Sequence, residues 1–282
     1  MPATRTRPKP SKVSKSVKPG TTAKTVGASG AAKAAAAPKA GKTAAVPSAA
    51  AILAEMKPLG RESYRRVMLN HGVKEPIWGV SIGDMKKIQK RAGIKSDYQL
   101  ALDLFDSGIY DAMYFAGLLA DDARMTRKDL QRWVARASGM LCDYTVPWVA
   151  AGSPHGHDLA LEWIDSPRPG IACAGWATLS SLVAITPDSE LDLAELKSLL
   201  LRVQKTIHQQ SDRVRYVMNS FVIALGCHVK PLTAAAEASA RAIGAVHVDM
   251  GDTDCKVPDA LQYIDKVRKR GSLGRKRASC KC

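Results

Sequence analysis

The chain has few aromatic side chains and no acidic residue near its N-terminus. Aromatic residues make up 5% of its 282 residues. Residues 1–50 contain ten Lys/Arg and no acid, and residues 266–282 contain eight Lys/Arg and again no acid. The stretch between them, 51–265, holds 24 basic residues and all 26 acids, a formal charge of −2. The net charge of +16 therefore resides in two basic tails, which excludes a uniformly basic histone-like protein and indicates a near-neutral folded domain.

The sequence also lacks a long hydrophobic run. Its longest uncharged stretch, Pro169–Pro187, is interrupted by glycines and hydroxyl residues and predicts a buried helix, not a membrane span. The first twenty residues lack the apolar core of a secretion signal. A mitochondrial transit peptide is disfavoured because the tail is Lys-rich and broken by proline. We expect a cytoplasmic protein with reduced thiols, associated with the nucleoid in a bacterium or nuclear in a eukaryote.

Composition divides the chain into three parts. Residues 1–47 consist mainly of Ala, Lys, Pro, Ser, Thr and Gly, and cannot bury enough apolar surface to offset the entropy lost on ordering. We predict that they are disordered and act either as an electrostatic arm that holds DNA or as a solubilising tail. Residues 48–270 are the predicted folded domain. Residues 271–282 are a second basic tail, which we also predict to be disordered.

Helical periodicity runs through nearly all of the predicted domain. One helix shows it most clearly, because its apolar side chains recur on a single face: Val214, Val217, Met218, Phe221, Val222 and Leu225. Gly, Pro and Ser separate about a dozen such segments, and the only strand-like piece is Ala245–Met250. We predict an all-α protein. Helix pairs roughly 40 residues apart fit a HEAT-like α-solenoid, with an irregular helical bundle as the alternative.

One carboxylate stands in an unusually apolar and aromatic segment. Asp143 is followed by Tyr144 and Trp148. A carboxylate in such a setting can stabilise the positive charge of an oxocarbenium-like transition state, and aromatic faces can cover a deoxyribose. The alternative is that Asp143 caps the following helix and that the aromatic residues belong to the core.

Two sets of potential metal ligands have spacings that match no standard zinc site. One combines a cysteine with two loop histidines, and the other a histidine with three C-terminal cysteines: Cys142, His155 and His157; His247, Cys255, Cys280 and Cys282. The loop Val246–Pro258 has three aspartates but lacks the glycine and terminal glutamate of a calcium loop. We predict no metal and no cofactor, and we expect this loop to be an ordered cap on the end of the solenoid.

The helix that opens with Asp212 carries polar residues beside its apolar stripe. Arg213 and Arg215 flank the stripe, and Asn219 shares a face with Arg215 because it lies four residues later. A cation and an amide on the rim of a concave surface suit contacts with DNA phosphates. A salt bridge between helices and a helix cap are the alternative roles.

An ordered series of motifs resembles the DNA alkylation repair proteins, the AlkD-like HEAT-repeat DNA glycosylases. The motifs span roughly residues 50–270 and are Gly72–Pro76 leading into Gly79–Ile88, Asp106–Ala112, Trp133 before Cys142-Asp143, and Arg213–Asn219. The resemblance implies a superhelical solenoid whose concave, basic face grips duplex DNA by its backbone. It also implies excision of N3- and N7-alkylated purines without flipping the base into a pocket.

The resemblance further implies a site made of an aspartate, two tryptophans that pack on the deoxyribose, and an arginine. Asp143 matches the aspartate. Gly139 stands at the first tryptophan position, Phe221 lies near the second, and Ala172–Leu179 has no cation where the arginine is expected. Trp148, Trp176 and Arg215 are candidates to replace the missing groups.

We therefore predict a monomeric protein that binds duplex DNA, including alkylated DNA, and does not associate with membranes. Asp143 is the catalytic candidate for a glycosylase. The predicted DNA contacts come from six residues: Phe221, Trp148, Tyr144, Arg213, Arg215 and Asn219. Two other functions remain open, namely a catalytically inactive module that binds distorted or branched DNA and a HEAT-repeat scaffold for other proteins.

Overall fold

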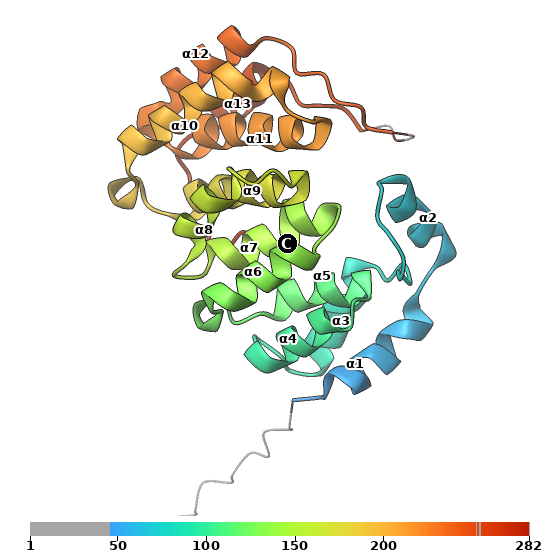
Figure 1. The fold of residues 1–282 in the computed structure, drawn as a ribbon. Coiled ribbons are helices and arrows are strands. Elements are labelled where there is room, and N and C mark those ends of the chain that lie inside the picture. The colour runs from blue at the N-terminus through green and yellow to red at the C-terminus, as the bar shows by residue number, and fades with distance from the viewer. Residues whose placement is uncertain (1–45, 252, 254, 282) are drawn as a thin grey trace, which may run out of the picture. The chain divides into compact units, whose positions relative to one another are not determined.

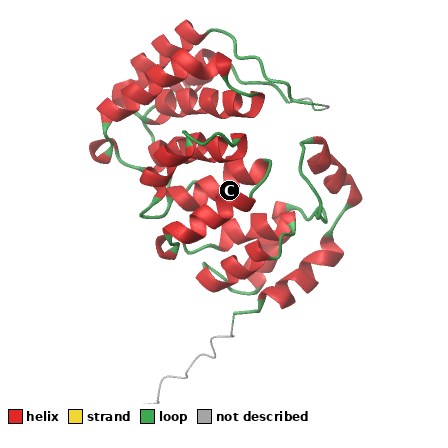
Figure 2. Cartoon of the chain, in the orientation of Figure 1, coloured by secondary structure: helices red, strands yellow, loops and turns green. Residues whose placement is uncertain are grey.

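The computed structural model describes residues 46–251, 253 and 255–281. The chain divides into two units, 1–44 and 45–282, and only the second is described here. The predicted basic arm therefore lies almost wholly outside the described residues. Within the described part every regular element is helical (Figure 2), which confirms the all-α prediction. None of its helices is long and apolar enough to cross a membrane.

Thirteen α-helices follow one another along the described residues (Figure 1). They are α1 (Ala49–Met56), α2 (Glu62–Asn70), α3 (Ile82–Arg91), α4 (Tyr98–Asp106), α5 (Tyr110–Leu119), α6 (Arg127–Arg136), α7 (Val146–Ala151), α8 (Gly156–Trp163), α9 (Pro169–Ile185), α10 (Leu193–Thr206), α11 (Asp212–His228), α12 (Thr233–Ile243) and α13 (Ala260–Lys269). Short turns join them, so consecutive helices such as α4 and α5, or α8 and α9, pack as antiparallel pairs.

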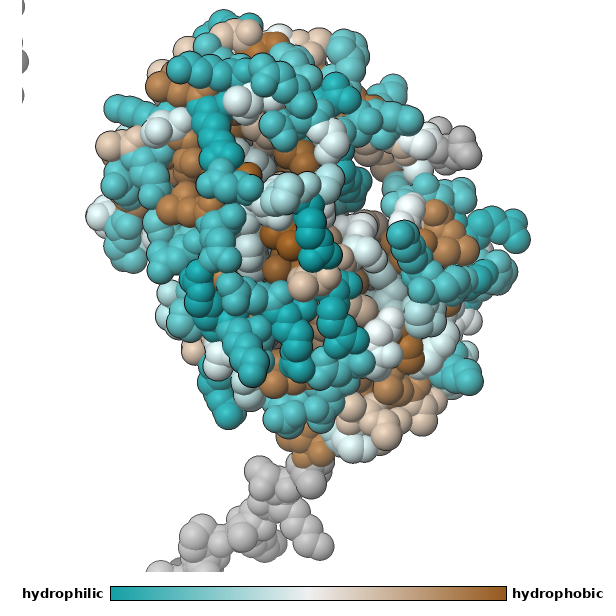
Figure 3. All heavy atoms as spheres, in the orientation of Figure 1, coloured by the Kyte–Doolittle hydropathy of each residue, from teal (hydrophilic) through white to brown (hydrophobic). Residues whose placement is uncertain are grey.

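From α4 onward the helices form two layers. We call them the A layer (α4, α6, α8, α10 and α12) and the B layer (α5, α7, α9, α11 and α13). In the B layer α9 packs against both α7 and α11, and α11 against α13. In the A layer α10 packs against α12. Apolar side chains fill the space between the layers, and the visible surface is mostly hydrophilic with scattered apolar residues (Figure 3).

Polar side chains fix where several helices begin. Ser48 Oγ accepts a hydrogen bond from Ala51 N at 3.3 Å and starts α1, and Asp97 Oδ1 accepts one from Leu100 N at 2.8 Å and starts α4. Thr126 begins α6 with a full capping box. Each cap satisfies backbone N–H groups that have no partner within the helix.

A glycine allows α9 to approach α8 closely. A Cβ at Gly175 would lie 2.6 Å from Ile164 N and 2.9 Å from Ala160 O, and these backbone atoms cannot move cheaply. Gly175→Ala should therefore lower the free energy of unfolding by about 1–3 kcal/mol. Gly83→Ala is the control, because a Cβ there would meet only Ser81 Oγ at 3.7 Å, and it should be neutral or stabilising by up to about 1 kcal/mol. Equal urea midpoints for the two variants would contradict this packing.

The C-terminal segment runs back across the carboxyl ends of B-layer helices. We call residues 272–281 the C-terminal strap. Gly274 N donates to Cys227 O in the last turn of α11 at 2.8 Å, and Arg277 N donates to Ala184 O in the last turn of α9 at 2.8 Å. Because the last carbonyls of a helix have no partner within it, the strap satisfies groups that would otherwise need water.

Lysines of the strap are held by the same helix ends. Lys276 forms an ion pair with Asp188 at 2.8 Å. Lys281 Nζ donates to Ala120 O, just beyond α5, at 2.8 Å and pairs with Asp122 at 2.7 Å. The charge distribution alone suggests a solvated arm for residues 271–282. The expectation of a disordered tail is wrong for residues 271–281, because these cations meet partly buried acids and the negative ends of helix dipoles.

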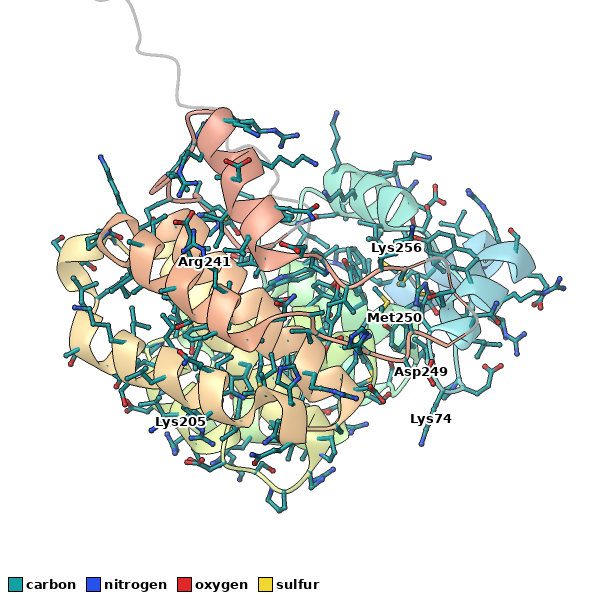
Figure 4. All side chains as sticks on the ribbon, turned by 90° about the horizontal axis from the view of Figure 1, so that it is seen from above. Lys74, Lys205, Arg241, Asp249, Met250 and Lys256 are labelled. Carbon is teal, nitrogen blue, oxygen red and sulfur yellow. The ribbon has the colours of Figure 1, made fainter. Side chains whose placement is uncertain are left out.

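The segment between α12 and α13, residues 244–259, contains no strand among its described residues, so the strand expectation for Ala245–Met250 is wrong. Asp249 N donates to Asp212 Oδ1 at 3.2 Å, which ties the loop to α11. Asp249–Gly251 and Asn70–Gly72 line a common cavity, and Figure 4 shows Asp249 and Met250 on the same side as Lys74. The loop thus does more than cover the last helices, because it also reaches the end of α2.

Candidate functional site

Asp143 lies on an irregular turn between α6 and α7. Leu141–Thr145 form a π-helical turn, η3, a conformation that occurs often at functional sites. Gly139 precedes it with a φ of 53°, a left-handed conformation that favours glycine, and its carbonyl accepts a hydrogen bond from Cys142 N at 3.0 Å. This turn directs Asp143 toward α11.

Asp143 forms an ion pair with Arg213, the second residue of α11. Its Oδ2 accepts a hydrogen bond from Arg213 Nη2. The Asp143 side chain is 3% exposed and that of Arg213 is 36% exposed. No side chain caps the start of α7, so the alternative role of Asp143 as a helix cap is wrong. Instead, the pair connects two parts of the B layer that lie 70 residues apart in the sequence.

Burial controls the protonation of this site. It raises the pKa of Asp143 to about 6, although Arg213 opposes the increase. The Asp143 carboxylate in turn raises the pKa of Arg213, so the guanidinium stays charged. Burial also raises the pKa values of Cys142 and Tyr144 to about 12. At neutral pH the site therefore contains one carboxylate, one guanidinium and neutral thiol and phenol groups.

Two cavities meet at Asp143. One, of about 510 Å³, is lined by Tyr144, Trp148, Tyr216 and part of the strap. The other, of about 440 Å³, is lined by Gly139, Arg168 and Arg213. Asp143 lines both, and its buried Oδ1 accepts no hydrogen bond from the described residues. Asp143 thus lies between the two cavities with one carboxylate oxygen that has no donor in the described part of the chain.

The aromatic candidates are exposed to very different degrees. Tyr144 is 36% exposed, whereas Trp148 is 7% and Phe221 0% exposed. Phe221 packs against Trp176 in the core, with ring centroids 5.2 Å apart. The expectation that Phe221 covers a deoxyribose is wrong, because its side chain points into the core between the layers. Trp148 packs against Tyr144, with ring centroids 5.8 Å apart, and exposes little surface of its own.

Arg215 and Asn219 make contacts within the protein instead of facing a DNA ligand. Arg215 pairs with Asp212 on its own helix. Asn219 is buried and donates to Pro258 O at 2.8 Å, which ties α11 to the loop before α13. Of the polar residues proposed on this helix as phosphate ligands, Arg213 is the one that lines a cavity beside Asp143.

Arg168 is a cation of the site that the sequence motifs did not single out. It is exposed just before α9, its Nη2 donates to Ala135 O at 3.1 Å, and it lines the 440 Å³ cavity with Arg213. The only feature of the sequence that could have identified Arg168 is its position next to the Pro-rich start of a helix. Tyr216 was also missed, although Arg213 lies over its ring, 5.7 Å from the centroid.

The histidines and cysteines of the described part form no metal site. No group of three or more His, Cys, Asp or Glu residues lies close enough there to hold an ion, and its five cysteines are free thiols. His157 contacts Glu195 at 2.8 Å and Asp158 at 3.4 Å, which joins α8 to α10. Cys282, from one predicted ligand set, lies outside the described residues.

The comparison with protein families agrees with this arrangement. The family model for the DNA alkylation repair enzymes matches residues 52–264. The chain belongs to this family. Two similar proteins, each named only as an uncharacterized protein, come from Listeria. Lin0241 of Listeria innocua is 30% identical and Lmo0209 of Listeria monocytogenes 29% identical, each over 220 residues that make up 77% of this chain and 95% of the relative.

A solved structure extends the comparison to the fold. It represents "a new family of proteins related to the HEAT-like repeat DNA glycosylases with affinity for branched DNA structures". It is 32% identical in sequence, superposes with a TM-score of 0.77, and the match covers 84% of this chain and 100% of the other. The predicted HEAT-like α-solenoid is thereby confirmed.

Proposed function

We propose that this family member is a DNA-binding protein that recognises branched DNA and does not excise bases. The observation that carries the proposal is the state of Asp143, which is buried and already paired with Arg213. A related protein of known structure, with 32% identity, belongs to a family with affinity for branched DNA, which supports the same conclusion.

The pairing of Asp143 matters because of what base excision requires. A glycosylase stabilises the cationic sugar with a carboxylate whose charge is directed at the reacting carbon. Here the Arg213 guanidinium lies against that carboxylate and offsets much of its field. Four of the tryptophans are at most 7% exposed, so they offer no open face to a sugar: Trp133, Trp148, Trp163 and Trp176. The site thus favours binding over catalysis.

Cations beside the site suit the DNA backbone. Arg168 and Arg213 line one cavity, and the whole chain carries a formal +16. Contacts between such cations and phosphates release counterions, so the affinity should be independent of sequence and should fall steeply with salt. A HEAT-repeat scaffold for proteins, the remaining alternative, would show no such dependence.

Glycosylase activity is the second candidate, and one observation favours it. Asp143 lines cavities beside the exposed Tyr144, and its Oδ1 has no partner among the described residues. An N7- or N3-alkylated purine is already a cationic leaving group, so a single carboxylate beside the sugar would supply much of the needed stabilisation.

The variant Asp143→Asn separates the two functions. We expect the wild type to release no base above background from duplex DNA that contains N7-methylguanine. The variant should bind a four-way junction within about threefold of the wild type, because phosphate contacts carry the affinity. A glycosylase would instead show release that falls by about a hundredfold or more in the variant. Asp103→Asn, at an exposed position on α4, is the matched control and should change neither measurement.

A further inference from the structure

The cavity of about 510 Å³ extends well beyond Asp143. It follows α11, because Tyr216 near the start of this helix and His228 at its end both line it. These two residues are twelve positions apart, which corresponds to about 18 Å along the helix axis. α9, which lies beside α11 (Figure 1), lines the cavity too. We call this elongated cavity the B-layer groove, and its walls include polar and aromatic residues of η3, α9, α11, α13 and the strap: Tyr144, Ser180, Tyr216, Ser220, Tyr263 and Arg277.

The two exposed aromatic side chains of the described part both lie at this groove. They are Tyr144 of η3, which is 36% exposed, and Tyr263 of α13, which is 46% exposed. Tyr216 of α11, which is half-buried, lines the groove as well. Every other aromatic residue among those described is buried or half-buried. Because these rings gather at one hollow instead of being scattered over the surface, they indicate a site for a ligand that stacks.

Hydrogen-bonding groups line the same groove. Ser180 Oγ donates to Trp176 O at 2.8 Å, and Ser220 Oγ donates to Tyr216 O at 3.0 Å. Each hydroxyl uses its proton within its own helix, and its oxygen can still accept a hydrogen bond. Burial raises the pKa of Tyr144 to about 12 and also raises that of Tyr216, so both phenols stay protonated at neutral pH and can donate. The groove thus provides the acceptors and donors that the edge of a nucleobase needs.

A cation without an acidic partner lies where the strap borders the groove. Arg277 is exposed, lines the groove and forms no ion pair with the described residues. Its backbone N–H donates to Ala184 O at 2.8 Å, which fixes the residue at the carboxyl end of α9. Lys281 also lines the groove, but it already pairs with Asp122 at 2.7 Å. Arg277 is therefore the strap cation that is available to a phosphate here.

Rings, hydrogen-bonding groups and an arginine along one groove are the chemistry that binds single-stranded DNA. A duplex keeps its bases stacked and paired, and their exposure costs free energy. A strand that leaves a branch point unpaired presents its bases without this cost. We propose that the B-layer groove binds such an unpaired strand, with bases stacked on Tyr144 and Tyr263 and a phosphate on Arg277. This inference rests on the proposed function and names the feature of branched DNA that the protein would recognise.

Forked DNA with and without bases in its unpaired arm tests the proposal. One probe is a forked duplex with a single-stranded thymine arm, and the other is the same fork with abasic residues in that arm. Both carry the same number of phosphates, so a difference in affinity measures the contribution of the bases. The full wild-type chain should bind the thymine fork about tenfold more tightly than the abasic fork, because stacked bases add affinity that the backbone does not supply.

Removal of the two exposed rings should abolish this preference. Tyr144→Ala/Tyr263→Ala should bind both forks with the affinity that the wild type has for the abasic fork. Tyr144→Phe/Tyr263→Phe keeps the rings and should stay within about twofold of the wild type. Val67→Ala/Leu201→Ala is the matched control, because these side chains are 49% and 53% exposed and lie outside the groove. This control should keep the wild-type preference.

Replacement of the strap arginine should act on the two forks alike. Arg277→Gln should weaken binding of both by the same factor and lower the slope of log affinity against log salt by about 1, because it removes a phosphate contact. Melting temperatures within about 2 °C of the wild type show that the variants are folded. The comparison of the two forks on the wild type depends on no variant.

Three results would overturn the proposal: a wild type that binds the two forks equally, an alanine variant that keeps the preference, or a control that loses it. The proposed function survives each of these results as long as the wild type prefers a fully paired four-way junction to linear duplex. A wild type without that junction preference contradicts the proposed function itself, whatever the forks show.

Discussion

Deletion of residues 271–282 should lower the melting temperature of the protein by about 10 °C. The strap supplies backbone hydrogen bonds to Cys227 O and Ala184 O, and Lys276 Nζ donates to Val183 O at 2.8 Å. Hydrogen bonds of this kind contribute about 1 kcal/mol each, and cations at helix carboxyl ends up to about 2 kcal/mol. The sum is about 3–5 kcal/mol, and each kcal/mol corresponds to about 2–4 °C for a domain of this size.

The stability lost on deletion of residues 271–282 should depend on pH, because Lys281 of the strap pairs with Asp122. Burial raises the pKa of Asp122 to about 6, and Lys281 opposes the increase. A carboxyl with a raised pKa takes up a proton on folding, so its burial costs stability as pH rises from about 4 through its folded pKa. Without Lys281 this cost extends to higher pH. The truncated protein should therefore lose more stability, relative to the wild type, at pH 8 than at pH 5.

The double variant Arg275→Gln/Arg277→Gln is the control for the deletion. It keeps the lysine contacts and the backbone donors of the strap, so its melting temperature should stay within about 2 °C of the wild type. Differential scanning calorimetry of the three proteins makes the comparison. If the truncated chain had the same melting temperature as the wild type, the strap would not stabilise the helix ends in solution.

Arg213→Gln should lower the free energy of unfolding by about 2–3 kcal/mol at pH 8. The substitution leaves the Asp143 carboxylate, 3% exposed, without its counterion. The loss lies below the range for fully buried pairs because Arg213 is 36% exposed and water reaches it.

The stability lost in Arg213→Gln should depend on pH, because Asp143 titrates in this range. The pKa of Asp143 is already raised to about 6, and removal of Arg213 should raise it further. Asp143 therefore takes up its proton on folding at low pH, and the protonated form does not need the guanidinium. The difference between wild type and variant should be small at pH 5 and should grow as pH rises through 6 to 8.

Two further variants complete the test. Arg168→Gln removes a cation that lines the same cavity but forms no ion pair in the described part, so it should change stability by less than about 0.5 kcal/mol. Asp143→Asn/Arg213→Gln removes both charges and should recover part of the loss at pH 8. Urea unfolding at pH 5 and pH 8 measures all of them. An Arg213→Gln loss that is equal at both pH values would contradict the buried ion pair.

Local patterns in the sequence were enough to predict most of the fold. The apolar stripe from Val214 to Leu225 lies on α11, and breakers such as Ser107-Gly108 separate helices as expected. These signals depend on residues within a few positions of each other. The docked strap was not predictable in this way, because Lys281 meets Ala120 across 161 residues. Nothing in the composition of a basic tail distinguishes a cation at a helix end from one in solvent.

The candidate site was predictable in its central residue and not in its partners. The apolar and aromatic neighbours of Asp143 correctly indicated an unusual carboxylate. Arg213 was expected to contact phosphate, and the structure gives it the additional role of counterion to Asp143. Periodicity showed that Phe221 lies on an apolar stripe, and that stripe faces the core. Which residues of two distant helices meet is set by packing, and local patterns in a sequence do not reveal it.

The most direct test of the proposed function is a competition measurement at one salt concentration. A labelled four-way junction bound to the full chain is displaced either by the unlabelled junction or by linear duplex of the same arm sequences and nucleotide concentration. We expect displacement by the linear duplex to require at least about tenfold more DNA, because it offers phosphates but not the branch point that the protein is proposed to recognise. Equal displacement by the two competitors would contradict recognition of branched DNA.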